Sequence, residues 1–211
     1  EIYSRPDRQN DYADDLNTRS QMINYLSGGS VYNPTDKGLG VPFEMTLAFH
    51  SDAGFSETDE WIGTLGVYTT NFNEGKLNSG ISRHASRDLT DMVMTELQHD
   101  LSAKYGRQWN RRGMWNRNYS ETRLPAVPSM ILEILSHQNF ADMRMGHEPD
   151  FKFTVARSVY KAILKHTATM HGTGYVVQPL PITRFAIKEG SKHTFRLSWQ
   201  GVVDPQEPTA N

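Results

Sequence analysis

The chain has 211 residues, of which 37% are hydrophobic, 10% aromatic and 22% charged. This composition supports a buried core and excludes collagen-like, coiled-coil and wholly disordered proteins. Its 22 basic and 24 acidic residues give a net charge of −2, which is too balanced to indicate a nucleic-acid-binding protein. Because the chain has no cysteine, any metal must be bound by His, Asp or Glu. No apolar run approaches the roughly 18 residues of a transmembrane helix, so we expect a soluble protein with no membrane span.

The first half of the chain predicts one helix and two strands. Apolar residues recur at helical spacing over residues 16–26, and Asp14 or Asp15 can cap this helix. After a polar loop, residues 43–49 are predicted to form a strand that ends at His50. The β-branched and aromatic residues 64–70 predict a second strand.

The second half predicts two longer helices with a strand between them. A helix is expected from Ser86 or Asp88 to Tyr105, followed by a basic and aromatic loop over residues 107–123. Residues 130–135 are apolar and predict a strand, and residues 153–164 predict a terminal helix. Strands that alternate with helices indicate an α/β domain, with a mostly parallel sheet flanked by helices.

The C-terminal tail has a different character. Residues 182–188 and 193–199 are two short β-like runs with prolines on both sides. Since two strands alone are marginally stable, we expect them to open a second, all-β module whose remaining strands lie outside the chain. The alternative is a disordered C-terminus. At the other end, Glu1 is preceded by no initiator Met and followed by no leader pattern, so we expect the chain to be truncated there as well.

Two predicted strands carry a polar residue where a ligand could bind. In an open α/β sheet, ligands bind beyond the carboxyl ends of the strands, and His50 lies at the end of its strand. An imidazole at this position can ligate a metal. The alternative is a half-buried histidine whose hydrogen bonds are satisfied within the protein.

Glu133 interrupts the apolar run of the later strand. Strand alternation places it on the same face as Ile131 and Leu135, where an ionised carboxylate is costly unless it is paired. Burial would raise its pKa and suit it to act as a general base or acid. The alternatives are an ion pair with Arg123, or a helix over residues 129–140 that would place Glu133 one turn from His137.

The basic and aromatic loop could bind a ligand by stacking. Trp109 and Trp115 are interleaved with arginines, a mixture that suits single-stranded nucleic acid or a sugar chain. The balanced net charge argues against nucleic acid. The alternative is a solvated loop that packs its tryptophans on the edge of the domain.

Three segments together resemble the zinc-dependent N-acetylmuramoyl-L-alanine amidases. They are Leu47-Ala48-Phe49-His50-Ser51-Asp52-Ala53, Arg112-Gly113-Met114, and residues 119–133 with Arg123, Pro125-Ala126-Val127-Pro128 and Ile131-Leu132-Glu133. The resemblance covers roughly Glu1 to His166 and implies that His50 is a zinc ligand and Glu133 the catalytic carboxylate. Arg19 falls on an arginine of an early helix of the family.

The resemblance also implies a mechanism, and it implies that some of the zinc ligands lie outside this chain. Zinc would activate a water, Glu133 would accept its proton, and Arg123 would orient Glu133 or contact the developing oxyanion. Asp52, Trp109 and Trp115 are assigned to substrate binding. The family's first zinc histidine and its zinc glutamate lie upstream of the position of Glu1. The remaining zinc ligands are therefore expected in a missing N-terminal segment of the same domain.

More narrowly, the chain is similar to multidomain, secreted proteins of Bacteroidetes that are labelled xanthan lyases, although its residues give no support for lyase chemistry. The similarity implies that residues 1–175 are the C-terminal part of an amidase-like domain, and that 176–211 are a linker and the first strands of a fibronectin type III-like module. The implied substrate is peptidoglycan or another glycan, and the implied location is secreted, periplasmic or cell-surface. Two other functions stay open, a non-catalytic glycan-binding domain and a structural spacer.

Overall fold

The computed structural model describes residues 11–35 and 38–210, so the predicted truncated start at Glu1 and part of the first loop lie outside the described residues. The helices are α1 (Asp11–Leu26), α2 (His84–Tyr105), α3 (Ser120–Arg123), α4 (Phe140–His147) and α5 (Pro149–His171), with 3₁₀ turns at Asn73–Gly75 and Pro208–Ala210. The strands are β1 (Thr46–Asp52), β2 (Thr64–Tyr68), β3 (Arg111–Asn116), β4 (Ser129–Ser136), β5 (Thr183–Glu189) and β6 (Phe195–Gln200).

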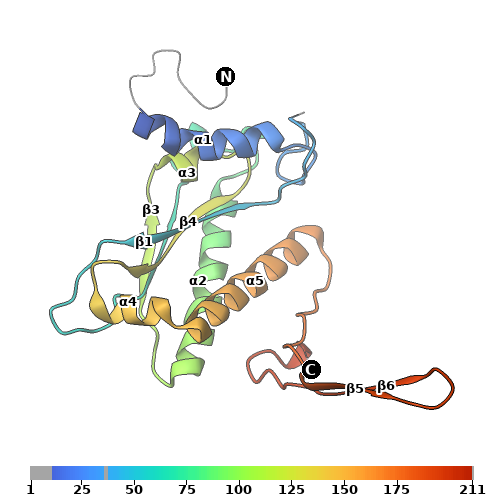
Figure 1. The fold of residues 1–211 in the computed structure, drawn as a ribbon. Helices are drawn as coiled ribbons and strands as arrows, with labels where there is room; N and C mark the ends of the chain where they lie inside the picture. Colours follow the sequence, from blue (N-terminus) through green and yellow to red (C-terminus); the bar gives the residue numbers. More distant parts are fainter. Residues whose placement is uncertain (1–10, 36–37, 211) are drawn as a thin grey trace.

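The central sheet has four strands in the order β1-β4-β2-β3 (Figure 1). The β1–β4 and β2–β3 pairs are parallel, and β2 runs antiparallel to β4. The predicted fold class is confirmed: an α/β domain with a mostly parallel sheet flanked by helices, followed by a short C-terminal β segment. Among the described strands, β1 has a neighbour on one side only, so its other edge is open.

The main core lies between the sheet and the pair of helices α2 and α5. The helical spacing predicted for α2 appears as a buried apolar stripe, which packs on a second stripe from α5: Leu89, Val93, Leu97 and Leu101 with Phe151, Val155, Val159 and Ala162. Both helices end where a glycine, Gly106 or Gly172, adopts the left-handed conformation, with φ of 64° and 62°. The end of α2 at Tyr105 agrees with the sequence prediction, whereas α5 extends beyond the predicted residues 153–164 at both ends.

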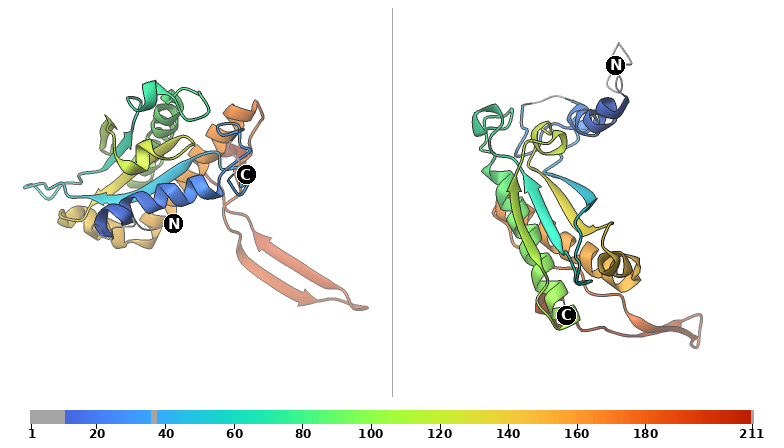
Figure 2. Two further views of the ribbon diagram at one scale, coloured as in Figure 1. Left: turned by 90° about the horizontal axis from the view of Figure 1, so that it is seen from above. Right: turned by 90° about the vertical axis from the view of Figure 1, so that its left-hand side faces the viewer.

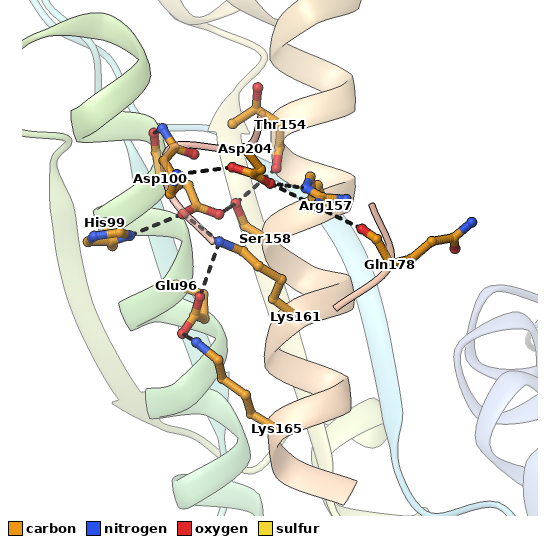
Figure 3. A network of polar contacts seen from close by, with 11 residues as sticks. Glu96, His99, Asp100, Thr154, Arg157, Ser158, Lys161, Lys165, Gln178 and Asp204 are labelled. Carbon is orange, nitrogen blue, oxygen red and sulfur yellow. Dashed lines mark hydrogen bonds and ion pairs between the residues drawn. The ribbon is translucent and has the colours of Figure 1, made fainter. Parts of the chain in front are cut away.

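A buried polar network also joins α2 to α5 (Figure 3). The Lys161 Nζ lies 2.8 Å from Asp100 Oδ1, and the Ser158 hydroxyl donates to Asp100 Oδ2 at 2.7 Å. Glu96 accepts from Lys165 and lies 3.6 Å from Lys161. Each charge in this network has an opposite charge or a hydrogen-bond donor beside it, so its burial between two helices is compensated.

Several boundaries differ from the sequence prediction. α1 begins at Asp11, before the expected caps, and β1 continues to Asp52, so that His50 lies inside the strand. Residues 107–123 are not a continuous loop, because they contain β3 and α3. The polar sequence of β3 gives little strand signal by itself, and its strand conformation depends on pairing with β2. The helical alternative for residues 129–140 is wrong for Glu133, which lies in β4.

The two β-like runs of the tail form an antiparallel hairpin that extends away from the α/β domain (Figure 2). One face of this hairpin exposes its large apolar side chains: Phe185, Ile187, Phe195, Leu197 and Trp199. The chain then returns to the domain, where Asp204 forms an ion pair of 2.7 Å with Arg157 of α5. The fibronectin type III-like identity of this segment stays a prediction. None of the helices in the described part of the chain is long and apolar enough to cross a membrane.

Candidate active site at the β1–β4 pair

The β1–β4 pairing places His50 next to Glu133. These two residues are register partners in adjacent parallel strands, so their side chains leave the sheet on the same face. Their face also carries Ala48 and Ile131, which belong to a small cluster separate from the core under α2 and α5. The fold therefore brings together the two residues that the sequence singled out from segments more than 80 positions apart.

Glu133 is a half-buried carboxylate that is only partly compensated. Burial raises the pKa of Glu133, and the nearby charges of His50 and Arg112 oppose this rise. Its Oε2 atom is buried and has no hydrogen-bond partner among the described residues. A carboxylate with a raised pKa and a free oxygen is suited to accept a proton from a water molecule or a substrate.

Glu121 is a site residue that the sequence analysis missed. Its Oε2 lies 3.0 Å from His50 Nε2, and its Oε1 accepts from Arg19 Nη1 at 3.3 Å. Arg19 falls on an arginine of the family in the sequence analysis, but no sequence pattern indicates Glu121 as its partner. Glu121 belongs to a single helical turn, which has too few residues to give a periodic pattern.

Asp52 lies two residues beyond His50 and forms an ion pair with Arg112 of β3. Burial alone would raise the pKa of Asp52, but the hydrogen bonds from Arg112 and from the Ala53 amide lower it below its usual range. Asp52 is therefore held ionised next to Glu133, whose pKa its negative charge raises further. Its role in substrate binding stays a prediction.

Arg123, the predicted partner of Glu133, has different contacts. Its Nη1 donates to the Asn118 carbonyl at 3.1 Å, and its own carbonyl accepts from Arg83 Nη2 at 2.7 Å. The arginine whose charge lowers the pKa of Glu133 is Arg112. Sequence proximity favoured Arg123, whereas the sheet brings Arg112 closer because β3 and β4 flank β2.

The two tryptophans assigned to substrate binding lie in different environments. Trp109 is completely buried and packs on Trp61 and Phe151, with ring centroids 5.1 Å and 5.7 Å away. It belongs to the core and offers no surface for a sugar ring. Trp115 lies in β3, keeps 45% of its surface exposed and has the Arg117 guanidinium 5.7 Å from its ring. Only Trp115 is placed to stack on a ligand.

The described residues do not by themselves form a complete metal site. In residues 11–35 and 38–210, no three His, Asp or Glu side chains are grouped so that they could hold a metal ion. His50 and Glu121 offer two neighbouring donor atoms, whereas a catalytic zinc ion commonly has three protein ligands. His137, the alternative partner of Glu133, contacts Ser51 instead.

A cavity of about 540 Å³ lies where β1, β4, α4 and α5 meet. It is lined mainly by apolar residues of α5, together with Phe49 and residues of β4 and α4. His50 also lines it, but Glu133, Glu121 and Asp52 are not among the lining residues. The carboxylates of the candidate site are therefore separate from this apolar cavity.

No family model matches the chain, and no curated protein is detectably similar in sequence. Solved structures of similar fold include the CwlD amidase from Clostridioides difficile, determined in complex with the GerS lipoprotein. Its TM-score is 0.54 and its identity 16%, and the match covers 80% of this chain and 71% of that chain. The N-acetylmuramyl-L-alanine amidase Ami1 from Mycobacterium smegmatis has a TM-score of 0.50 and 17% identity, with 73% and 61% of the two chains covered.

The match to a third structure, the N-acetylmuramoyl-L-alanine amidase from Clostridium difficile 630, has a TM-score of 0.46 and 12% identity over 60% of this chain. The chain spans 59% of that amidase and 61% of Ami1, which is less than two thirds of either protein. At these identities the similarity concerns the fold, while function has to be argued from the site. The chain thus contains an α/β domain with the fold of the N-acetylmuramoyl-L-alanine amidases.

Proposed function

We propose that the α/β domain is an amidase-type cell-wall hydrolase that cleaves the amide bond between muramic acid and the first L-alanine of peptidoglycan. The observation that carries this proposal is the pairing of His50 with Glu133 on one face of the sheet. Glu133 has the raised pKa and the unpartnered buried oxygen that a proton-transfer residue needs. The fold shared with peptidoglycan amidases supports the choice of substrate.

Glu133 would act first as a base and then as an acid. Its ionised carboxylate takes a proton from the water that attacks the amide carbonyl, and the new carbon–oxygen bond gives a tetrahedral intermediate. The protonated Glu133 then returns the proton to the nitrogen as the carbon–nitrogen bond breaks. The products are a free lactyl carboxylate and the amine of L-alanine. Arg112 keeps positive charge close to Glu133 and favours its ionised form.

Among the described residues, His50 is the one that we propose as a zinc ligand. The two donor groups of the described residues do not fit a complete zinc site, so no step is assigned to the metal. We expect any further ligands to come from a segment of the same domain upstream of Glu1. Peptidoglycan lies outside the cytoplasmic membrane, which favours a secreted, periplasmic or cell-surface location.

The open edge of β1 supports a further segment of the same domain. An edge strand presents unpaired backbone groups, and Phe49 of β1 is more than half exposed beside the apolar cavity. An additional strand would satisfy the backbone groups and cover this apolar surface. Hydrogen exchange of the β1 amides in the full-length protein tests this expectation, because a paired strand would protect them and an open edge would not.

The hydrolase proposal is tested with Glu133→Gln in the full-length protein, assayed on muramyl peptides. Loss of most of the hydrolysis is expected, and wild-type activity would refute the proposal. Glu44→Gln is the matched control, because Glu44 also has a buried Oε2 with no hydrogen-bond partner in residues 11–35 and 38–210, while its Oε1 lies 3.2 Å from His171 Nε2. Glu44→Gln should keep full activity.

Two further measurements on the wild type distinguish the other hypotheses. Glycan binding without hydrolysis would favour a non-catalytic binding domain. Metal analysis would separate zinc-dependent from zinc-independent hydrolysis.

A further inference from the structure

Glu121 lies in the short helix α3, whose backbone is fixed by hydrogen bonds from neighbouring side chains. The buried guanidinium of Arg83 donates to the Thr122 carbonyl at 3.3 Å and to the Arg123 carbonyl at 2.7 Å. The Thr122 hydroxyl lies 3.1 Å from the Tyr119 amide and caps the start of the same turn. These bonds satisfy backbone groups that a single turn cannot pair by itself, so the position of Glu121 is fixed by its neighbours.

Helix α1 holds the same turn from the side. The Ser120 hydroxyl lies 3.0 Å from Asn17 Oδ1, and the Asn24 amide group bonds both the Leu124 carbonyl and the Ala126 amide at 2.8 Å. Arg19 then contacts the carboxylate of Glu121 itself. Because Glu121 keeps only 13% of its side-chain surface exposed, its carboxylate has little freedom to turn toward solvent.

This anchored carboxylate approaches one particular nitrogen of His50. The contact joins Glu121 Oε2 to His50 Nε2 at 3.0 Å. An ionised carboxylate can only accept hydrogen bonds, so the imidazole must donate from Nε2. In the neutral ring the proton is then fixed on Nε2, and Nδ1 is left as the basic nitrogen.

We propose that Glu121 is a positioning residue, which fixes the orientation of the His50 ring and holds its proton on Nε2, so that Nδ1 is the nitrogen available for the reaction. The proposal rests on the proposed hydrolase function for the role of His50, but the tautomer it assigns is a property of the protein alone. It also gives α1 a function, because Arg19 secures Glu121 across more than 100 positions of sequence.

The decisive measurement is the tautomer of His50, observed by long-range proton–nitrogen NMR correlations of the full-length protein. Spectra are recorded in alkaline buffer, where imidazoles are neutral, and His50→Asn identifies the signals. The wild type should show the form protonated at Nε2. Glu121→Met keeps a side chain of similar length but removes the acceptor, so both tautomers should become populated. Glu121→Gln should restore the Nε2–H form in part, because its amide oxygen can still accept.

Asp15→Asn is the matched control. Asp15 is the second carboxylate that contacts Arg19, at 2.7 Å, but it is exposed and pairs with Arg19 without contacting His50. Its substitution should leave the tautomer unchanged. If Glu121→Met fails to fold, Arg19→Met provides a second variant, which loosens Glu121 and should give a smaller shift in the same direction. An unchanged tautomer in the folded Glu121 and Arg19 variants would overturn the proposal.

Hydrolysis provides a separate readout. Loss of a partner that orients an active-site histidine typically costs about 10- to 100-fold in activity, so kcat should fall by this factor in Glu121→Met with a smaller change in KM. If Glu133→Gln keeps its activity while Glu121→Met alters the tautomer, the hydrolase proposal fails and the positioning role stands. If Glu133→Gln is inactive while the tautomer is insensitive to Glu121, the positioning role alone is refuted.

Discussion

The polar network between α2 and α5 and the polar cluster on the β1–β4 face differ in how completely their charges are paired. Between α2 and α5, Lys161 and Asp100 are both almost fully buried, and Ser158 supplies an additional donor to the carboxylate (Figure 3). On the β1–β4 face, Glu133 is half-buried, and its buried Oε2 has no hydrogen-bond partner among the described residues. The first cluster satisfies its groups within the protein, whereas the second leaves a group available.

This difference separates a structural role from a chemical one. Satisfied charges in a core fix the relative position of two helices, and their removal is felt as a loss of stability. An unsatisfied carboxylate beside a histidine costs stability and is expected where it serves a reaction. Glu121 connects the two cases, because both of its carboxylate oxygens have partners and one of these partners is His50 of the candidate site.

The largest expected effect is the separation of activity from stability in Glu133→Gln. Loss of a residue that transfers protons typically lowers the rate about 10²- to 10⁴-fold. Because burial raises the pKa of Glu133, its ionised form destabilises the folded protein at neutral pH. The variant should therefore unfold at a denaturant concentration equal to or above that of the wild type. A large loss of stability would indicate that Glu133 is a structural residue.

The second effect is a loss of stability on breaking the α2–α5 network. Lys161→Met leaves the buried Asp100 carboxylate without its lysine, and loss of one partner of a buried ion pair costs about 3–5 kcal/mol of unfolding free energy. Urea denaturation measures this loss. The control is Lys165→Met, because Lys165 is 25% exposed against 2% for Lys161, and its loss should cost less than about 1 kcal/mol. Equal losses in both variants would contradict the assignment.

The fold and the central pair of the site could be predicted from the sequence for physical reasons. Helices α2 and α5 carry long apolar stripes, so the apolar periodicity of the sequence located both helices. His50 and Glu133 are polar residues in otherwise apolar strand segments, so the same kind of local pattern singled out both residues. Glu121 could not be found this way, because its role depends on contacts with α1 and β1 that are distant in sequence. The ion pair of Asp52 with Arg112 likewise depends on strand order, which local patterns do not specify.

A third effect is a pH dependence of stability that comes from a buried histidine outside the site. His166 lies 3.2 Å from the Tyr32 hydroxyl, and burial lowers its pKa. Burial also raises the pKa of Tyr32 to about 12, so its hydroxyl stays protonated. Since the folded-state pKa of His166 is below its unfolded value of about 6.5, its contribution to stability is present above that pH and is lost as the pH falls.

His166→Gln, which can still bond the Tyr32 hydroxyl, should therefore flatten the decline in melting temperature on acidification. Thermal unfolding of the wild type and the variant across the acidic range measures this difference. His171→Gln is the control on the same helix, because His171 is partly exposed. A decline of wild-type steepness in His166→Gln would show that other groups are responsible.

The smallest effect expected concerns the acid limb of the activity profile. Glu133 must be ionised to accept a proton, so kcat/KM should fall as the pH drops through its pKa, which burial raises and Arg112 partly lowers again. Arg112→Gln removes that positive charge and leaves the Asp52 carboxylate without its ion-pair partner. Both changes raise the pKa of Glu133, so the acid limb should move to higher pH. Arg111→Gln changes the neighbouring residue of β3, which pairs with Asp91, and should leave the limb in place. A limb that moves to lower pH in Arg112→Gln would mean that the group titrating in the reaction is not Glu133.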